Sequence, residues 1–228
     1  MPLASLLAVG FLLRALEQPA PALWRGAQLT ALSGRGGLLS VLGGLRTPLA
    51  AGYWLRANVA WENRDAAAME ALIGLTVAAD ERPLYFWLNG ARMLAYDVPG
   101  WLPADAPAAV RRRAVEAQAQ RALRLLEHGL GWRGAAAALH VEMANIHLRR
   151  LGDLENAARC YRLAAEQPGA PYYAARIHAE LLRALGRPRE ALLWLRRILP
   201  GLPPHDPEAR REVVRERIAA LERELAGR

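Results

Sequence analysis

The chain has 228 residues, of which 53% are hydrophobic, and its formal net charge is +8. Hydrophobic content at that level supports a buried core and excludes a disordered chain of low hydrophobicity. All 30 basic residues are arginine and none is lysine, which excludes the lysine Schiff-base chemistry of some enzymes.

The basic charge is concentrated in the C-terminal half. Residues 104–228 hold 22 arginines against 15 acidic residues, whereas residues 1–103 hold 8 against 7. The use of arginine without any lysine has two interpretations: the composition of a GC-rich genome, or a surface selected for bidentate recognition of carboxylate or phosphate. The surplus favours an acidic partner on this half. Nucleic acid is not expected, because the arginines alternate with glutamates as on a solvated helix face.

The first element along the chain is an uncharged apolar run over residues 3–13, which Arg14 ends. It is too short to span a bilayer, which needs about 20 residues. It is similar to the apolar core of a secretory signal, and residues 20–22 offer a small-residue cleavage site, although no basic residue precedes the run. Two interpretations stay open: an export signal or membrane anchor, and a first helix of the soluble fold.

Glycine-rich breaks separate this run from the rest of the chain. They lie at residues 33–37 and at Gly43-Gly44. We therefore expect residues 1–47 to form an N-terminal apolar segment with a Gly-rich linker. Residues 48–228 are expected to form a helical repeat domain.

From Pro48 onward, good helix formers between glycine, proline and aspartate breaks predict a series of helices. The expected helices span residues 48–63, 66–78, 84–95, 106–128, 138–151, 153–166, 172–185, 187–199 and 206–225. Asp65 and Asp105 are expected to cap the helices that follow them. Residues 96–104 are expected to form an inserted loop, because they contain two prolines and a glycine.

Two glycines 34 residues apart, Gly152 and Gly186, mark an internal repeat. Their surroundings match at the same offset: Leu148 with Leu182, Arg149 with Arg183, Leu151 with Leu185, Ala157 with Ala191, and Arg162 with Arg196. A helix–turn–helix repeat of 34 residues is the period of the tetratricopeptide unit. Both glycines are expected to take the left-handed conformation at the turn between two helices, where a side chain would be strained.

Over about residues 50–228, the chain resembles the tetratricopeptide repeat (TPR) family. The small-then-aromatic pair Ala157-x3-Tyr161 reproduces that family's spacing in the second helix of the unit. The resemblance implies an all-α fold: a right-handed α-solenoid of stacked antiparallel helix hairpins with a C-terminal capping helix. The usual Trp and Leu-Gly of the first helix are missing, and Ala144-Asn145 and His178-Ala179 stand in their place. A helical hairpin array of another family is therefore the alternative.

A second resemblance concerns location. Residues 42–46 (Leu-Gly-Gly-Leu-Arg) followed by residues 54–57 (Trp-Leu-Arg-Ala) look like a signature of uncharacterised bacterial repeat proteins with an N-terminal membrane segment. This resemblance implies a protein of the bacterial cell envelope, membrane-anchored or periplasmic. The alternative location is cytoplasmic.

The chain offers no spacing that indicates catalysis, a metal or a cofactor. His140 and His147 lie seven residues apart, whereas helical metal sites use spacings of three or four. No Gly-Lys-Ser/Thr phosphate loop and no Gly-x-Ser-x-Gly elbow occur. We expect no enzyme activity, no cofactor and no small-molecule substrate. Cys160 and His178 are expected to pack in the core, with a reactive thiol as the alternative for Cys160.

The candidate binding site follows from the TPR resemblance, in which the first helix of each pair lines a concave groove. Carrying that register onto the third and fourth pairs brings six residues to the groove: Glu142, Arg149, Tyr173, Arg176, Glu180 and Arg183. Arg149 and Arg183, one repeat apart, together with Tyr173 are expected to hold an acidic or C-terminal peptide. The alternative is a solvated helix face with intrahelical pairs such as Arg176–Glu180. The chaperone-type carboxylate clamp is not reproduced, since Glu180 stands where that clamp uses asparagine.

The function expected from these features is a scaffold or adaptor for protein–protein interaction, in an envelope-associated complex. One alternative is a peripheral membrane-surface protein that uses the apolar N-terminus and the arginine-rich helices on anionic lipid. A second alternative is a helical-repeat enzyme.

Overall fold

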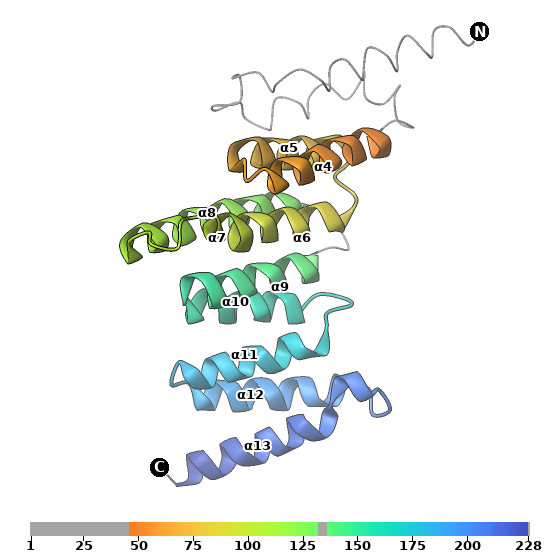
Figure 1. The fold of residues 1–228 in the computed structure, drawn as a ribbon. Coiled ribbons are helices and arrows are strands. Elements are labelled where there is room, and N and C mark those ends of the chain that lie inside the picture. The colour runs from red at the N-terminus through yellow and green to blue at the C-terminus, as the bar shows by residue number, and fades with distance from the viewer. Residues whose placement is uncertain (1–45, 132–135, 228) are drawn as a thin grey trace, which may run out of the picture. The chain divides into compact units, whose positions relative to one another are not determined.

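The computed structural model describes residues 46–131 and 136–227 (Figure 1). The expected apolar run, the cleavage site and the glycine-rich breaks lie outside these residues. All regular elements of the described residues are helices, which confirms the all-α fold class. The chain divides into two units, residues 1–80 and 81–228.

The described part of the first unit is a helix hairpin, α4 (Arg46–Glu62) and α5 (Ala66–Ala79). The expected cap at Asp65 is confirmed, because its Oδ1 accepts a hydrogen bond from the Ala68 amide at 3.0 Å. At the other end of the hairpin, Thr47 Oγ1 donates to Asp80 Oδ2 at 2.8 Å. The two helices are therefore fixed at both ends.

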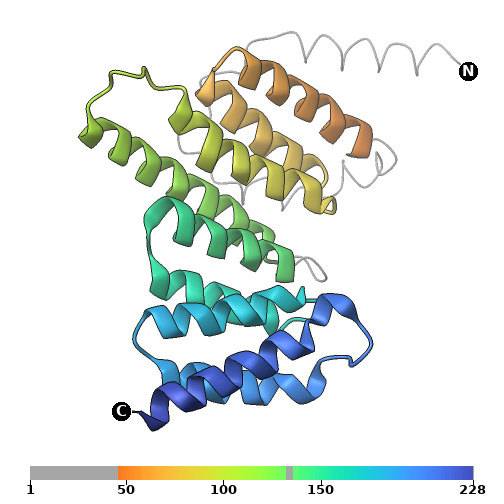
Figure 2. The same ribbon diagram turned by 60° about the horizontal axis from the view of Figure 1, so that its bottom comes forward.

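The second unit contains the remaining helices. They are α6 (Leu84–Arg92), the π-helical turn η3 (Met93–Asp97), α7 (Val98–Gly100), α8 (Ala108–Gly129), α9 (Ala136–Ile146), the π-helical turn η4 (His147–Leu151), α10 (Leu154–Ala165), α11 (Tyr172–Ala184), α12 (Pro188–Ile198), the 3₁₀ turns η5 (Leu199–Gly201) and η6 (Pro207–Ala209), and α13 (Arg211–Ala226). From α8 to α13, each α-helix packs against the next one in sequence. Figure 2 shows α13 running along the last hairpin.

The two glycines of the 34-residue repeat take the expected left-handed conformation. Gly152 has φ +65° and Gly186 has φ +75°. Gly152 ends the turn between α9 and α10, where its amide donates to the carbonyl of His147. Ala157 and Ala191, which also match at the repeat offset, are both fully buried. The left-handed glycine and the buried alanine thus both recur at the 34-residue offset.

We expect Gly152→Ala to lower the free energy of unfolding by about 1 kcal/mol or more, because alanine resists a positive φ. A Cβ at this position would meet nothing within 4 Å, so the cost comes from the backbone and not from a clash. Urea denaturation followed by circular dichroism measures the change. Gly100→Ala is the matched control, since that site is equally open and its φ is not positive. Equal stability of both variants would contradict the account of the turn.

The expected loop over residues 96–104 is wrong in its first half. The helix that begins at Leu84 continues through η3 and α7 to Gly100. In η3 the hydrogen bonds reach five residues back, as from the amide of Val98 to the carbonyl of Met93. Pro99 then falls in the first turn of α7, where a missing N–H breaks no α-helical hydrogen bond. Proline therefore does not end the helix here.

Two expected helix starts are also wrong. α8 begins after Pro107, which occupies the capping position, so Asp105 does not cap it. The last helix begins at Arg211 and not near residue 206. Asp206 instead caps the 3₁₀ turn η6, accepting from the Glu208 amide at 2.8 Å, and Arg210 then interrupts the helical path with φ +45°.

His178 and Cys160 are packed in the core, as expected. His178 Nδ1 lies 2.8 Å from the Ala158 carbonyl, and its ring meets Trp194 edge-on at 4.7 Å between centroids. His178 thereby links α10, α11 and α12. Burial raises the pKa of the Cys160 thiol, which keeps it protonated and unreactive.

The stability of the protein is expected to fall as the pH is lowered through about 6.5. Burial is the main cause that lowers the pKa of His140, His147 and His178 from the ordinary value of 6.5. The unfolded chain therefore binds more protons than the folded chain as the pH falls through 6.5, and the equilibrium shifts toward unfolding. Urea denaturation at a series of pH values measures the slope. His178→Gln is expected to reduce it, and a flat profile would contradict the account.

Candidate functional site

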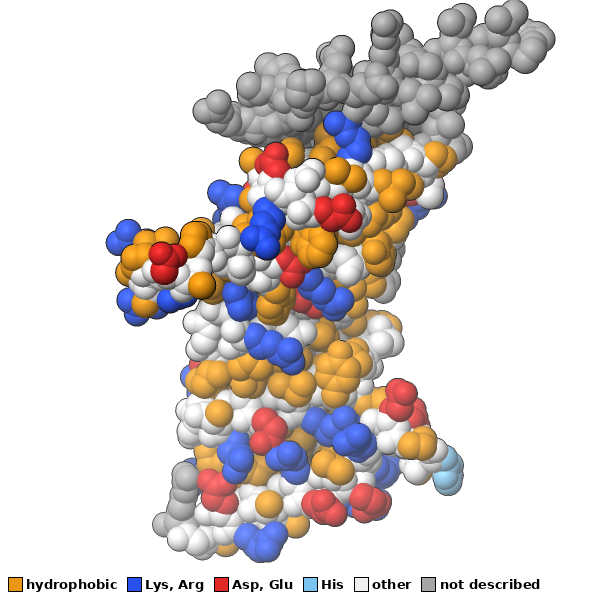
Figure 3. All heavy atoms as spheres, viewed as in Figure 1, with side chains coloured by type: hydrophobic (Ala, Val, Ile, Leu, Met, Phe, Trp, Pro, Cys, Tyr) orange, Lys and Arg blue, Asp and Glu red, His pale blue; other side chains and the backbone are white. Residues whose placement is uncertain are grey.

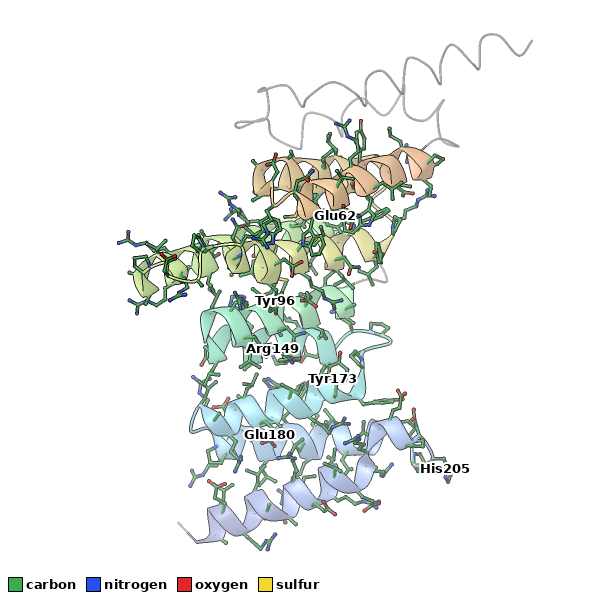
Figure 4. The ribbon with its side chains drawn as sticks, viewed as in Figure 1. Glu62, Tyr96, Arg149, Tyr173, Glu180 and His205 are labelled. Atoms are coloured by element: carbon green, nitrogen blue, oxygen red, sulfur yellow. The ribbon has the colours of Figure 1, made fainter. Side chains whose placement is uncertain are left out.

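An open cleft of about 420 Å³ lies between the end of α6, the two π-helical turns and α9. We name it the Tyr96 cleft; it is lined by Arg92, Tyr96, Glu142, Asn145 and Arg149. Figure 4 shows Tyr96, Arg149 and Tyr173 on one face of the second unit, on η3, η4 and α11. The cleft therefore collects side chains from segments that are far apart in sequence.

A partly buried ion pair forms one wall of the Tyr96 cleft. Arg92 Nε and Nη2 both donate to Glu142 Oε2, at 3.0 and 2.8 Å. The Glu142 side chain is only 4% exposed, whereas that of Arg92 is 52% exposed. The hydrogen bond to Glu142 raises the pKa of Arg92 against the opposing effect of burial. Arg92 thus neutralises the negative charge of the cleft.

Both π-helical turns of the described residues contribute to this cleft. Tyr96 belongs to η3, and Arg149 belongs to η4. The guanidinium of Arg150, also in η4, lies 5.3 Å from the centre of the Tyr96 ring. Burial is the main cause that raises the pKa of Tyr96, so its hydroxyl stays protonated. Because π-helical turns in proteins frequently occur at functional sites, their meeting here identifies the cleft as the candidate site.

Asn145 and Arg149 present hydrogen-bond donors to the cleft. Asn145 Oδ1 accepts from the Tyr161 hydroxyl at 2.8 Å, which leaves its amide N–H groups as donors. Arg149 lies four residues further on the same helical face and is exposed. Within residues 46–131 and 136–227, no carboxylate pairs with Arg149. Its guanidinium is therefore available to an external anion.

Three of the six residues expected at the groove lie at or near this cleft. Glu142 and Arg149 line it. Tyr173 is 44% exposed and lies on the same face, on α11 (Figure 4). Glu142 is not an exposed groove residue, because Arg92 covers it.

The other three expected residues contact the C-terminal segment. Arg176 Nη1 donates to the carbonyls of Glu208 and Ala209, at 3.3 and 3.2 Å. Burial lowers the pKa of Arg176, with Arg210 and Arg217 adding to the effect. Arg176 therefore holds the chain segment that leads into α13.

Glu180 and Arg183 form ion pairs at the junction of α11 and α13. Glu180 accepts from Arg217 of α13 and lies 3.7 Å from Arg183 on its own helix. The intrahelical pair in α11 is thus Arg183–Glu180 and not the expected Arg176–Glu180. Figure 3 shows arginine and acidic side chains interspersed over these C-terminal helices. Arg183 is engaged with an acid, so the two repeat-related arginines differ in their surroundings.

Sequence reasoning missed Arg92, Tyr96 and Asn145 as members of the site. Arg92 and Glu142 are 50 positions apart, which matches no helical or repeat period. Tyr96 was assigned to an expected loop. Asn145 could have been identified from the sequence, since its spacing of four residues to Arg149 places both on one helical face.

The described residues contain no group of three or more His, Cys, Asp or Glu side chains that could hold a metal ion. None of the helices in residues 46–131 and 136–227 is both long enough and apolar enough to cross a membrane. A scan of the chain against protein-family models found no match, and a search of curated proteins found none either.

Proposed function

We propose that the second unit belongs to a TPR-like, right-handed α-solenoid and serves as a protein–protein interaction scaffold. Three features support the proposal: consecutive packing of α8 to α13, left-handed glycines one repeat apart, and fully buried alanines at the same offset. Stacked helix hairpins present an extended surface suited to a partner peptide or helix. In this proposal the chain acts by binding and not by catalysis.

The observation that carries the proposal is the Tyr96 cleft, with Arg149 as its binding residue. Arg149 has no carboxylate partner in the described part of the chain, and Arg92 has already neutralised Glu142. An acidic side chain or a C-terminal carboxylate of a partner would accept hydrogen bonds from Arg149 and Asn145. A hydrogen bond to a charged group contributes about 1.5–3 kcal/mol. The partly exposed ring of Tyr173 adds apolar contact next to these donors.

The proposal extends to a location in the bacterial cell envelope. This part rests on the apolar run over residues 3–13 and on the sequence signature at residues 42–46 and 54–57. Liposome flotation with and without residues 1–20 separates the scaffold from a peripheral membrane-surface protein. A scaffold anchored by its N-terminus loses flotation when these residues are removed, and a protein bound through its arginine-rich helices keeps it.

The binding proposal is tested by affinity purification of the tagged full chain from its own organism, in detergent, followed by mass spectrometry. We expect a stoichiometric protein partner that is lost with Arg149→Gln. The matched control is Arg113→Gln, which removes the same charge from an exposed arginine of α8 without a partner in the described residues. Equal recovery of the partner with both variants would contradict the assignment of the Tyr96 cleft.

A further inference from the structure

A second pocket of the second unit, of about 480 Å³, lies between α10 and α12. We name it the α10–α12 pocket. Four arginines line it: Arg159 and Arg162 of α10, Arg187 just before α12, and Arg197 of α12. It shares no lining residue with the Tyr96 cleft. The two sites are therefore independent sets of side chains.

The charges in this pocket are only partly balanced. Arg187 donates to Glu155 at 2.9 Å, and Arg197 donates to Glu166 at 3.1 Å. Within the described residues, no carboxylate pairs with Arg159 or Arg162. Arg187 also lies 3.9 Å from Glu190, so Glu155, Glu166 and Glu190 together leave the four arginines one positive charge in excess. An acidic ligand would balance this excess and supply carboxylates to Arg159 and Arg162.

Arg197 of α12 stacks on an aromatic ring. The guanidinium of Arg197 lies 4.7 Å from the centre of the Trp194 ring. Trp194 is itself fixed, since its Nε1 donates to the Ala175 carbonyl at 2.9 Å. Stacking on a ring leaves the edge of a guanidinium able to donate to a carboxylate. Arg197 therefore has a defined contact on one side of the pocket.

An apolar side chain adjoins these charges. Leu193 lines the pocket and is 66% exposed. A ligand that offered only charge would leave this surface in contact with water, whereas a leucine-sized side chain beside its acids would cover it. The pocket thus combines the two cationic groups of Arg159 and Arg162 with one exposed apolar side chain, Leu193.

We propose that the α10–α12 pocket binds an acidic segment of a partner protein, with carboxylates on Arg159 and Arg162 and a neighbouring apolar side chain on Leu193. Guanidinium groups match carboxylates in a bidentate geometry, which gives the arginines a direct role in recognition. The inference goes beyond the proposed function, because it assigns a second docking site whose residues are separate from the Tyr96 cleft.

The test uses fluorescence anisotropy on the full chain in detergent, with a fluorescein-labelled peptide of alternating glutamate and leucine. A twin peptide with glutamine in place of glutamate reports binding without charge. We expect the double variant Arg159→Gln with Arg162→Gln to weaken binding of the glutamate peptide by about tenfold or more, the equivalent of one lost charged hydrogen bond. Equal binding of the two peptides by the unaltered chain would overturn the proposal.

Two control variants show where the peptide binds. Arg112→Gln with Arg113→Gln removes the same charge from exposed arginines of α8. An equal loss with this control would show non-specific attraction and overturn the proposal. A loss with Arg149→Gln alone would place the peptide in the Tyr96 cleft; this result would overturn the present inference and support the proposed function. Inorganic phosphate that binds through Arg159 and Arg162, when the peptide does not, would overturn the assignment to an acidic segment.

Discussion

Replacing Trp194 with alanine is expected to lower the free energy of unfolding by about 3–5 kcal/mol, the usual cost of removing a buried aromatic side chain. Trp194 is 8% exposed and belongs to a core cluster with residues of α11 and α13. The substitution leaves a cavity against His178 and removes the hydrogen bond from Trp194 Nε1 to the Ala175 carbonyl. Urea denaturation monitored by circular dichroism measures the change.

The neighbouring residue supplies the control for this prediction. Leu193→Ala removes a large side chain from the same helix, but that side chain is 66% exposed. We expect a change within about 0.5 kcal/mol, as for most surface substitutions. Comparable losses for Trp194→Ala and Leu193→Ala would contradict the account of how α12 packs.

Replacing Arg92 with leucine is expected to lower the free energy of unfolding by about 2 kcal/mol. The substitution leaves Glu142, which is 4% exposed, without its charge partner. Breaking a fully buried pair costs about 3–5 kcal/mol, and the smaller figure allows for the half-exposed position of Arg92. Chemical denaturation at neutral pH measures the loss.

A double variant distinguishes the cost of an unpaired charge from that of lost packing. Arg92→Leu with Glu142→Leu removes both charges, and we expect it to recover most of the stability lost by Arg92→Leu alone. The exposed pair Arg187–Glu155 serves as the comparison, since solvent screens it and Arg187→Leu should cost much less stability than Arg92→Leu. Equal losses in the free energy of unfolding for Arg92→Leu and Arg187→Leu would contradict the role of Arg92 as the charge partner of Glu142.

The sequence predicted those parts of the fold that depend on local chemistry. The cap at Asp65 and the left-handed turns at Gly152 and Gly186 need only a residue and its nearest neighbours along the chain. The periodic apolar positions located most helices to within a few residues. The all-α class followed from these local signals.

The sequence did not predict features that depend on tertiary contacts or on unusual helix geometry. A π-helical turn carries the helix past Pro99, although proline normally indicates a break. Arg210 has a positive φ, so α13 begins only after this residue. Arginine has no preference for that conformation, and the sequence therefore does not indicate it. The Arg92–Glu142 pair joins α6 to α9 across 50 positions, which no periodic pattern encodes.

The residues expected at the groove were also predicted only in part, because some of them make tertiary contacts that the sequence does not indicate. The register of the repeat brought Arg149 and Tyr173 to one face, with Glu142 beside Arg149 in the cleft, because helical spacing is local. It did not show that Arg176 holds the segment before α13 or that Glu180 pairs with Arg217 of that helix. Those contacts depend on where the C-terminal segment folds back, which the period of the repeat does not specify.

Photo-crosslinking in the organism's own cells tests whether this chain binds a partner protein on the face of the Tyr96 cleft. A photoreactive phenylalanine analogue would replace Tyr173 in the full chain, and a control chain would carry it at Val110, which is exposed on α8. We expect one protein to be crosslinked from position 173 but not from position 110, and the crosslink to be lost when Arg149→Gln is added. The same crosslinks from both positions, or an unchanged crosslink with Arg149→Gln, would contradict it.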